Sequence, residues 1–292
     1  MRKLSTLAAS VALVLAGTLM AAFAPSASAI TGNYQEDFEH DYVGLIAFHT
    51  DPDPETGDPF SHRCSGTLIS PTVMVTAGHC TEGVDSGRVY FQQAVGPNYD
   101  PDAFGGLGGD PTTGYPYEGG VTFSRADNYG FHDFEGYPDT HDVGVVVLDE
   151  PYNPPSGEFG ELPDEGAIDE YLASTRKKQT LRFRTVGYGL LDQDPVPDPG
   201  DRERMTAVGY LIEGTSPVTE FNLKTTANPS KNKGGSCNGD SGGPVFFEGT
   251  NIIAAVVSFG MNPQCKGQDY SYRLDRAPVL SWINDEDRPD AG

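Results

Sequence analysis

Short runs of apolar and β-branched residues recur along the chain, and segments rich in turn-forming glycine and proline separate them. The runs are VGLIAFH (43–49), GTLIS (66–70), VMVTA (73–77), VGVVVL (143–148), LRFRTVGYG (181–189), MTAVGYLI (205–212) and IIAAVVSFG (252–260). Runs of this length, bounded by turn signals, favour β-strands and an all-β sandwich or barrel. One helix is predicted near the end, over 276–285, because Val279, Leu280, Trp282 and Ile283 can pack along one of its faces.

Residues 1–29, MRKLSTLAASVALVLAGTLMAAFAPSASA, have the layout of a secretory signal peptide. Arg2 and Lys3 precede a long apolar run, and residues 27–29 form an A-x-A cleavage site. An uncleaved membrane anchor is the alternative, but the cleavage site and the lack of a second apolar span argue against it. We therefore expect a secreted, extracellular protein with no stable membrane association and one domain over residues 30–292.

The charge balance restricts the partners of this protein. The sequence holds 42 acidic and 19 basic residues, which gives a formal net charge of −23 at pH 7. An excess of negative charge disfavours nucleic acid as a partner. The acidic segment 51–58 lacks the spacing of an EF-hand loop, so we expect a turn there, and neither a metal ion nor a cofactor. Segments 96–120 and 190–204 have the composition of surface loops, and we expect a monomer.

The cysteines predict disulfide bonds. There are four of them, Cys64, Cys80, Cys237 and Cys265, and an even number in an exported protein indicates two bridges. Three pairings are possible, and the simplest joins the two pairs that are close in sequence, 64 with 80 and 237 with 265. No C-x-x-C motif occurs, so a structural zinc site is not expected.

Three segments each carry one residue type that nucleophilic catalysis requires. Ser241 lies within GGSCNGDSGGPVFF (234–247), His79 follows the run VMVTA, and Asp142 precedes the run VGVVVL. A serine hydroxyl becomes a good nucleophile only when a base takes its proton, and that base needs an orienting group. Each residue alone has an ordinary explanation as a turn residue or a packed side chain, but together they supply all three parts.

The segments VTAGHC, HDVGVVVLD and CNGDSGGPV resemble the three signature segments of the trypsin-like (chymotrypsin-fold) serine peptidases, in that family's order. GTLISPTVMVTAGHC, VGYG, VSFG and SWI extend the likeness from about Ile30 to Ile283. The resemblance implies two packed antiparallel β-barrels with a catalytic site between them. It also implies a serine endopeptidase that hydrolyses polypeptide substrates through an acyl-enzyme.

The resemblance further assigns a role to each site residue. Ser241 would attack the peptide carbonyl, His79 would take its proton and return it to the leaving amine, and Asp142 would orient His79. The backbone N–H groups of Gly239 and Ser241 would stabilise the oxyanion. Ser258 would support Asp142 and pair its backbone with the substrate.

The resemblance also indicates which residues form the substrate pocket. Gly235, six residues before Ser241, stands where a carboxylate would select arginine or lysine, so a preference for basic residues is not expected. Gly260 would leave the pocket entrance open, and Tyr270 is expected on its back wall. We therefore predict cleavage after apolar residues: medium to large ones if Tyr270 points away from the pocket, small ones if it fills it.

Removal of the signal peptide would leave Ile30 as the first residue. In the family, a new amine at such a position pairs with the acidic residue before the nucleophile, which is Asp240 here. We see no room for a propeptide, so signal peptidase itself is expected to produce the active chain start. A cut after Ala27, followed by trimming of two residues, is the alternative.

The family's disulfides would join Cys64 to Cys80, bracing the histidine loop, and Cys237 to Cys265, bracing the nucleophile loop and the pocket. Two other functions stay open at this point. An esterase could use the same three residues, because acyl transfer to serine is shared by ester and peptide substrates. A secreted binding protein without catalysis could use the same fold.

Overall fold

The structure is a computed structural model that describes residues 30–50, 60–84, 86–95, 120–190, 202–213, 217–228 and 233–290. Four of our predictions lie outside these residues wholly or mostly: the signal peptide, the turn at 51–58, the loop at 96–120 and the loop at 190–204.

The first half of the described chain forms a closed antiparallel barrel. Its strands are β3 (Val43–His49), β4 (Phe60–Leu68), β5 (Val73–Thr76), β6 (Ser86–Tyr90), β7 (Val121–Asn128) and β8 (Gly144–Leu148), and they pair in the order β3-β4-β5-β8-β7-β6. β3 closes the barrel, since Ile46 pairs with Cys64 on β4 and with Val89 on β6. The apolar runs of the sequence fill its interior.

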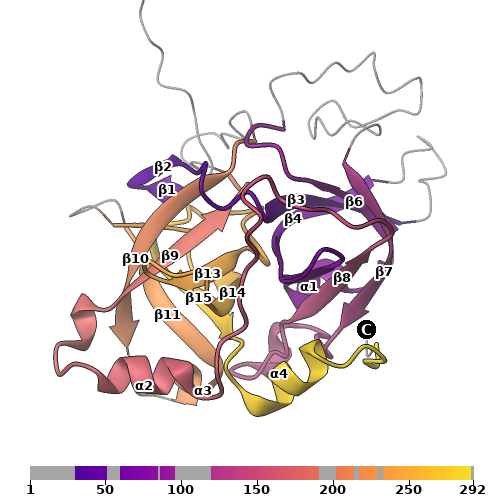
Figure 1. Cartoon of the computed structure of the whole chain (residues 1–292). Helices are drawn as coiled ribbons and strands as arrows, with labels where there is room; N and C mark the ends of the chain where they lie inside the picture. The colour runs from indigo at the N-terminus through magenta and orange to yellow at the C-terminus, as the bar shows by residue number, and fades with distance from the viewer. Residues whose placement is uncertain are drawn as a thin grey trace, which may run out of the picture.

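The second half forms another antiparallel barrel beside the first (Figure 1). Its strands are β9 (Arg182–Gly187), β10 (Met205–Glu213), β11 (Asn222–Ala227), β13 (Pro244–Phe247), β14 (Ile253–Gly260) and β15 (Gly267–Arg273). They follow the order β11-β15-β14-β13-β9-β10, and pairing of β10 with β11 closes the barrel. The predicted class, all-β with two packed antiparallel barrels, is confirmed.

Short elements complete the fold. The helices are α1 (Gly78–Thr81), α2 (Ala167–Ala173), α3 (Pro217–Phe221) and α4 (Ala277–Ile283), with 3-10 turns η2 (Phe134–Gly136) and η3 (Lys178–Thr180). At the start of the described chain, β1 (Thr31–Gly32) pairs with β12 (Gly234–Gly235), and β2 (Tyr34–Glu36) pairs with β10. The predicted C-terminal helix is confirmed as α4, which buries Val279, Trp282 and Ile283.

The two barrels share one apolar interface. Phe246 on β13 is fully buried, and its ring stacks on His40 with centroids 5.0 Å apart and meets the edge of Tyr42 at 6.2 Å. Tyr188, just after β9, donates its hydroxyl to the backbone carbonyl of Gln92 at 2.7 Å. Aromatic side chains of the second barrel therefore hold it against residues of the first.

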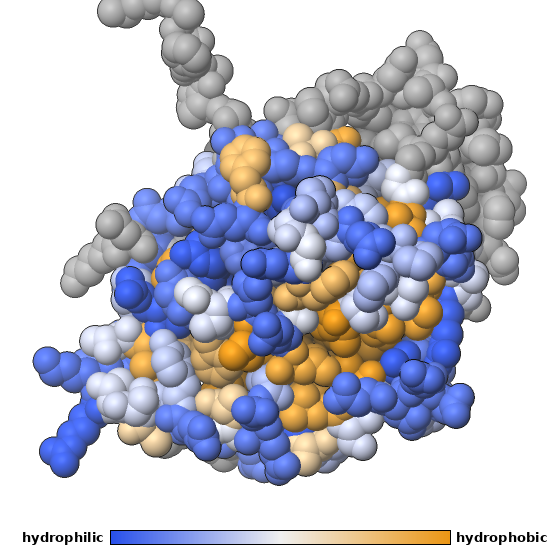
Figure 2. Space-filling model, in the orientation of Figure 1, coloured by the Kyte–Doolittle hydropathy of each residue, from blue (hydrophilic) through white to orange (hydrophobic). Residues whose placement is uncertain are grey.

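Apolar and polar residues both lie on the face of the molecule that Figure 2 shows. In Figure 2, apolar residues gather above α4, over the first barrel, while much of the remaining face is polar. Within the described ranges, no helix combines the length and the apolar composition needed to cross a membrane.

The packing of Phe246 predicts a large cost of truncation. We expect Phe246→Ala to lower the free energy of unfolding by about 3–5 kcal/mol, because it leaves a cavity between the barrels. Phe38, which is 68 % exposed, is the control, and Phe38→Ala should cost less than about 0.5 kcal/mol. Urea denaturation of both variants measures this. Equal costs for the two would contradict the assignment of Phe246 to the interface.

Candidate active site

His79 is held where the first barrel ends a strand. It is the second residue of α1, a single turn that follows β5 directly. The preceding Gly78 leaves no space for a side chain, because a Cβ there would lie 2.6 Å from Cβ of Phe131. The backbone N–H of His79 donates to Oδ1 of Asp142 at 2.8 Å, and its side chain is 22 % exposed. The backbone of His79 is therefore held by Asp142, while part of its imidazole ring is exposed.

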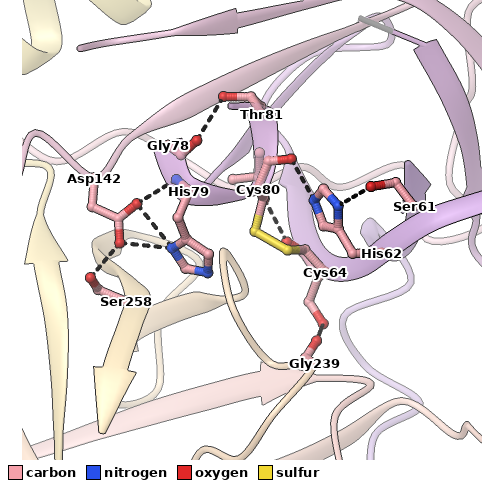
Figure 3. The surroundings of a disulfide bond; sticks show 12 residues. Ser61, His62, Cys64, Gly78, His79, Cys80, Thr81, Asp142, Gly239 and Ser258 are labelled. Carbon is pink, nitrogen blue, oxygen red and sulfur yellow. Dashed lines mark hydrogen bonds and ion pairs between the residues drawn. A yellow bond between two sulfur atoms is a disulfide. The ribbon is translucent and has the colours of Figure 1, made fainter. Parts of the chain in front are cut away.

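Asp142 holds the Nδ1 atom of this imidazole ring. It lies just before β8, has no exposed surface, and accepts hydrogen bonds from Nδ1 of His79 at 3.0 and 3.1 Å. Ser258 on β14 donates its hydroxyl to the same carboxylate (Figure 3). The register of β14 shifts between Val257 and Phe259, and such an irregularity turns a side chain out of the regular alternation. The predicted contacts of Asp142 with His79 and Ser258 are both present.

The electrostatics of this pair favour its charged form. Burial alone would raise the pKa of Asp142, but the charge and hydrogen bonds of His79, together with the bond from Ser258, lower it. Burial alone would lower the pKa of His79, but the charge and the hydrogen bond of Asp142 outweigh it and raise the pKa. The carboxylate thus makes the imidazole a stronger base and stabilises the imidazolium.

Ser241 reaches this region through a glycine turn. The backbone carbonyl of Ser241 accepts from the N–H of Ser65 at 2.8 Å, and Gly242 donates to the carbonyl of Val257 at 2.8 Å. Gly242 has a φ of +74°, and a Cβ there would lie 2.0 Å from Oγ1 of Thr76 at the end of β5. Only glycine permits this approach, which brings the turn that holds Ser241 against the strand that leads to His79.

Two side-chain atoms that the sequence predicts to react make no hydrogen bond in the described part of the protein. Neither the hydroxyl of Ser241 nor Nε2 of His79 makes a hydrogen bond to another described residue, so the expected contact between them is not formed in this structure. Catalytic hydrogen bonds commonly tighten only when a substrate is bound. The open nitrogen of His79 points away from Asp142 (Figure 3).

Backbone donors lie next to Ser241. Gly239 has a φ of +99°, and its carbonyl accepts from the hydroxyl of Ser65 at 2.9 Å. The N–H of Asp240 is used internally, since it donates to the carbonyl of Cys237 at 3.0 Å. The N–H groups of Gly239 and Ser241 have no acceptor among the described residues.

Both predicted disulfides are present and confirm the pairing of close neighbours. Cys64 is bonded to Cys80 beside His79, and Cys237 is bonded to Cys265 beside the nucleophile turn (Figure 3 shows the first). Cys64, His79 and Cys80 lie close enough to be considered as metal ligands. Because the two sulfurs are bonded to each other, they offer no thiolate to a metal ion.

A cavity of about 100 Å³ opens beside Ser241, and Ser258 and Gly260 line it as expected. Gly235 is not among the lining residues, and a Cβ on it would lie 2.5 Å from Oδ2 of Asp269, which does line the cavity. Tyr270 is not part of the lining. Its ring stacks on Phe259 with centroids 4.7 Å apart, since neighbouring residues of β15 point to opposite faces.

Of the two neighbouring residues on β15, Asp269 lines the cavity and Tyr270 does not. The aromatic rings of Phe131 and Phe134 also lie beside His79, with ring centroids 5.9 Å from that of the imidazole, and the sequence did not predict them there. Side chains alternate along a strand, so either Asp269 or Tyr270 must face the cavity. The sequence alone does not say which one, because that depends on how β15 pairs with its neighbours. No local pattern marks the two phenylalanines.

Both residues of the predicted activation pair are fully buried. Ile30 is fully buried in a cluster with Met205 and Ala207. Asp240 is also fully buried, and its carboxyl accepts from the N–H groups of Gly189 and Cys237, each at 2.8 Å. Burial raises the pKa of Asp240 to about 7, although these two bonds oppose the shift.

Comparison with known proteins places this arrangement in a family. The family model described as Trypsin matches residues 30–283, so the chain belongs to the trypsin family. Trypsin delta of Drosophila melanogaster is 24 % identical over 233 residues, which cover 76 % of this chain and 78 % of that protein. Chymotrypsin-C of Bos taurus is 23 % identical over 271 residues and covers 90 % of each chain.

Solved structures show the same fold. A structure of HL collagenase matches with a TM-score of 0.59 at 20 % identity and covers 89 % of this chain and 96 % of that one. Human heparin binding protein matches with a TM-score of 0.56 at 19 % identity, over 89 % and 99 % of the two chains. Relatives of this family are serine endopeptidases that act on polypeptides.

The bond from Ser258 to Asp142 predicts a measurable role. We expect Ser258→Ala to lower kcat/KM roughly 10- to 100-fold, since a hydrogen bond to a charged group contributes about 1.5–3 kcal/mol. Ser271→Ala is the matched control, because the buried hydroxyl of Ser271 on the neighbouring strand has no partner among the described residues. Steady-state kinetics on one peptide substrate compares them. Similar losses in both variants would show a general packing effect.

Proposed function

We propose that this chain is a secreted serine endopeptidase that hydrolyses peptide bonds through Ser241, His79 and Asp142. The observation that carries the proposal is the buried carboxylate of Asp142, which holds Nδ1 of His79 while Nε2 stays open. A cavity lined by Ser241 adjoins this pair. The two disulfides support an oxidising, extracellular location.

The reaction follows from these positions. Oγ of Ser241 attacks the carbonyl carbon of the scissile bond while Nε2 of His79 takes the hydroxyl proton. The N–H groups of Gly239 and Ser241 stabilise the oxyanion, and Asp142 stabilises the imidazolium. His79 then gives its proton to the leaving amine, and an acyl-enzyme forms. Water, deprotonated by His79, hydrolyses the ester and restores the hydroxyl of Ser241.

The pocket sets the expected preference. Gly235 brings no carboxylate to the base of the cavity, so the enzyme is not expected to be restricted to arginine and lysine. Gly260 is exposed, and a Cβ there would meet no atom within 4 Å, which leaves the entrance open to larger side chains. Neutral apolar side chains are therefore expected substrates.

The chain start is proposed to complete the site. We propose that cleavage before Ile30 frees an amine that pairs with Asp240. Two observations support this: the buried carboxyl of Asp240 has a raised pKa, and Ile30 has a φ of +73° while it is in peptide linkage. A β-branched residue with positive φ is strained by about 1–3 kcal/mol, and cleavage removes that torsion.

Labelling with a fluorophosphonate probe tests the nucleophile. We expect a single adduct on Ser241 in the secreted protein, and none in Ser241→Ala or after denaturation, because only an activated serine reacts. Intact mass gives both the adduct and the first residue of the chain. A folded wild-type chain that starts at Ile30 and stays unlabelled would contradict the proposed catalysis and would favour a binding role.

The length of the chain start tests the pairing with Asp240. A chain that begins at Ser28 should show kcat/KM about 100-fold or more below a chain that begins at Ile30, since an unpaired buried charge costs about 3–5 kcal/mol. Removal of residues 28 and 29 by an aminopeptidase is the control, and it should restore activity. Full activity of the longer chain would overturn the proposal.

The same two chains should differ in their pH dependence. A carboxyl with a raised pKa binds its proton more tightly in the folded state, so the longer chain should lose stability as pH rises from about 4 to about 7. Pairing with the amine of Ile30 lowers the pKa of Asp240, and the chain that begins at Ile30 should keep that stability. Urea denaturation at pH 5 and pH 7.5 measures the difference between them.

A further inference from the structure

Ser65 is a fully buried residue of the first barrel that binds the turn holding Ser241. It lies on β4 and has no exposed surface. Its backbone N–H donates to the carbonyl of Ser241 at 2.8 Å, and its hydroxyl donates to the carbonyl of Gly239 at 2.9 Å. One residue of the first barrel therefore holds two residues of the turn that leads into β13 of the second barrel.

The chemistry of its two partners fixes the direction in which the hydroxyl of Ser65 donates. The backbone N–H of Tyr188, just after β9, donates to Oγ of Ser65 at 3.0 Å. An N–H group can only donate and a carbonyl can only accept, so the single hydroxyl proton must go to the carbonyl of Gly239. The hydroxyl therefore connects β9 of the second barrel, β4 of the first barrel and the turn that holds Ser241.

The peptide group between Gly239 and Asp240 is held at both ends. Ser65 binds its carbonyl, and its N–H, which belongs to Asp240, donates to the carbonyl of Cys237 at 3.0 Å. Gly239 has a φ of +99°, and glycine is the residue whose backbone is least restricted by its own atoms. The orientation of this peptide group therefore depends on its hydrogen bonds, one of which comes from the side chain of Ser65.

The peptide groups on either side carry the N–H groups of Gly239 and Ser241. Their carbonyls are engaged as well: that of Asn238 accepts from Leu190 at 2.7 Å, and that of Asp240 accepts at 2.8 Å from the N–H three residues further on. The two N–H groups themselves have no acceptor among the described residues. The middle peptide group joins these two, so its orientation sets the angle between their N–H groups.

We propose that Ser65 is a positioning residue for the oxyanion site: its hydroxyl fixes the middle peptide group and thereby aligns the N–H groups of Gly239 and Ser241. This rests on the proposed endopeptidase function and adds to it a residue that does not line the cavity beside Ser241. Donors that are already aligned stabilise the developing oxyanion without having to reorient, which is why their alignment affects the rate.

Ser65→Ala tests the proposal, because it removes the hydroxyl and leaves the backbone bond to Ser241 in place. We expect kcat to fall about tenfold or more, since loss of one oxyanion donor lowers kcat about 10²- to 10³-fold and both donors here stay present but lose their alignment. KM should stay within about twofold, because Ser65 does not line the cavity. Steady-state kinetics on one peptide with leucine before the cleaved bond measures both constants.

Thr67→Val is the matched control on the same strand. Thr67 is 1 % exposed, and its hydroxyl has no partner among the described residues, so its removal should leave kcat and KM as in the wild type. Ser65→Cys is a second variant that keeps the shape of the side chain and carries the test if Ser65→Ala does not fold. A thiol is a weak donor, so kcat of Ser65→Cys should lie between those of the wild type and Ser65→Ala. Urea denaturation shows which variants are folded.

Affinity for a transition-state analogue separates alignment of the donors from general packing. A peptide aldehyde bonds through its carbonyl carbon to Oγ of Ser241, the serine proton passes to Nε2 of His79, and the carbonyl oxygen becomes the oxyanion. The matched peptide alcohol binds the same cavity and forms no such bond. Ser65→Ala should weaken inhibition by the aldehyde about tenfold or more and inhibition by the alcohol less than about twofold.

Amide hydrogen exchange provides a measurement that does not depend on catalysis. In the inactive Ser241→Ala chain, we expect Ser65→Ala to speed exchange of the Asp240 N–H at least about tenfold, because the peptide group that contains it loses a bond. The N–H of Leu274, which donates to the carbonyl of Ala254 at 3.0 Å, is the internal control and should exchange as before. NMR spectroscopy follows both N–H groups in one sample.

The two failures give different results. A wild-type chain that is labelled at Ser241, but whose kcat and aldehyde affinity do not respond to Ser65→Ala, would overturn the role of Ser65 and leave the endopeptidase standing. Equal losses for the aldehyde and the alcohol, similar losses in Thr67→Val, or a loss of kcat without faster exchange at Asp240 would also overturn that role. An unlabelled Ser241 together with faster exchange at Asp240 would overturn the catalysis and keep the hold of Ser65 on the turn.

Discussion

The burial of Asp142 is the constraint on which the site depends. Its carboxylate has no contact with solvent, and its donors come from both barrels: His79 follows β5 of the first, and Ser258 lies on β14 of the second. A buried charge is tolerated only when several donors satisfy it. The site therefore exists only when both barrels are folded and packed, which makes the interface around Phe246 part of the catalytic architecture.

The turn that holds Ser241 is also constrained, because close neighbours leave no space for side chains at positions 242 and 243. Gly242 lies against Thr76 at the end of β5, and a Cβ at Gly243 would lie 2.5 Å from the carbonyl oxygen of Val186 on β9. Side chains at these positions would push the turn away from the first barrel. Glycine therefore permits the close approach of this turn to the first barrel.

Three buried carboxyl groups lie around this turn, and they differ in their partners and in the direction of their pKa shifts. Asp142 has a partner within the protein, and its pKa is lowered. Asp240 and Asp269 accept hydrogen bonds from backbone N–H groups, and burial raises the pKa of each to about 7, although the charge of Arg63 lowers that of Asp240. In our proposal the new amine of Ile30 gives Asp240 a cationic partner.

The amino-acid sequence alone predicted the class of fold, the three segments that carry Ser241, His79 and Asp142, and the disulfide pairs, because these depend on local composition and short motifs. It missed strands that carry many polar residues, such as β7 and β11, since pairing with neighbours stabilises them more than their own pattern does. It also chose Tyr270 over Asp269 for the pocket. Only the tertiary structure decided that, because the register of β15 against β14 sets which side chains face inward, and register is a property of two strands together.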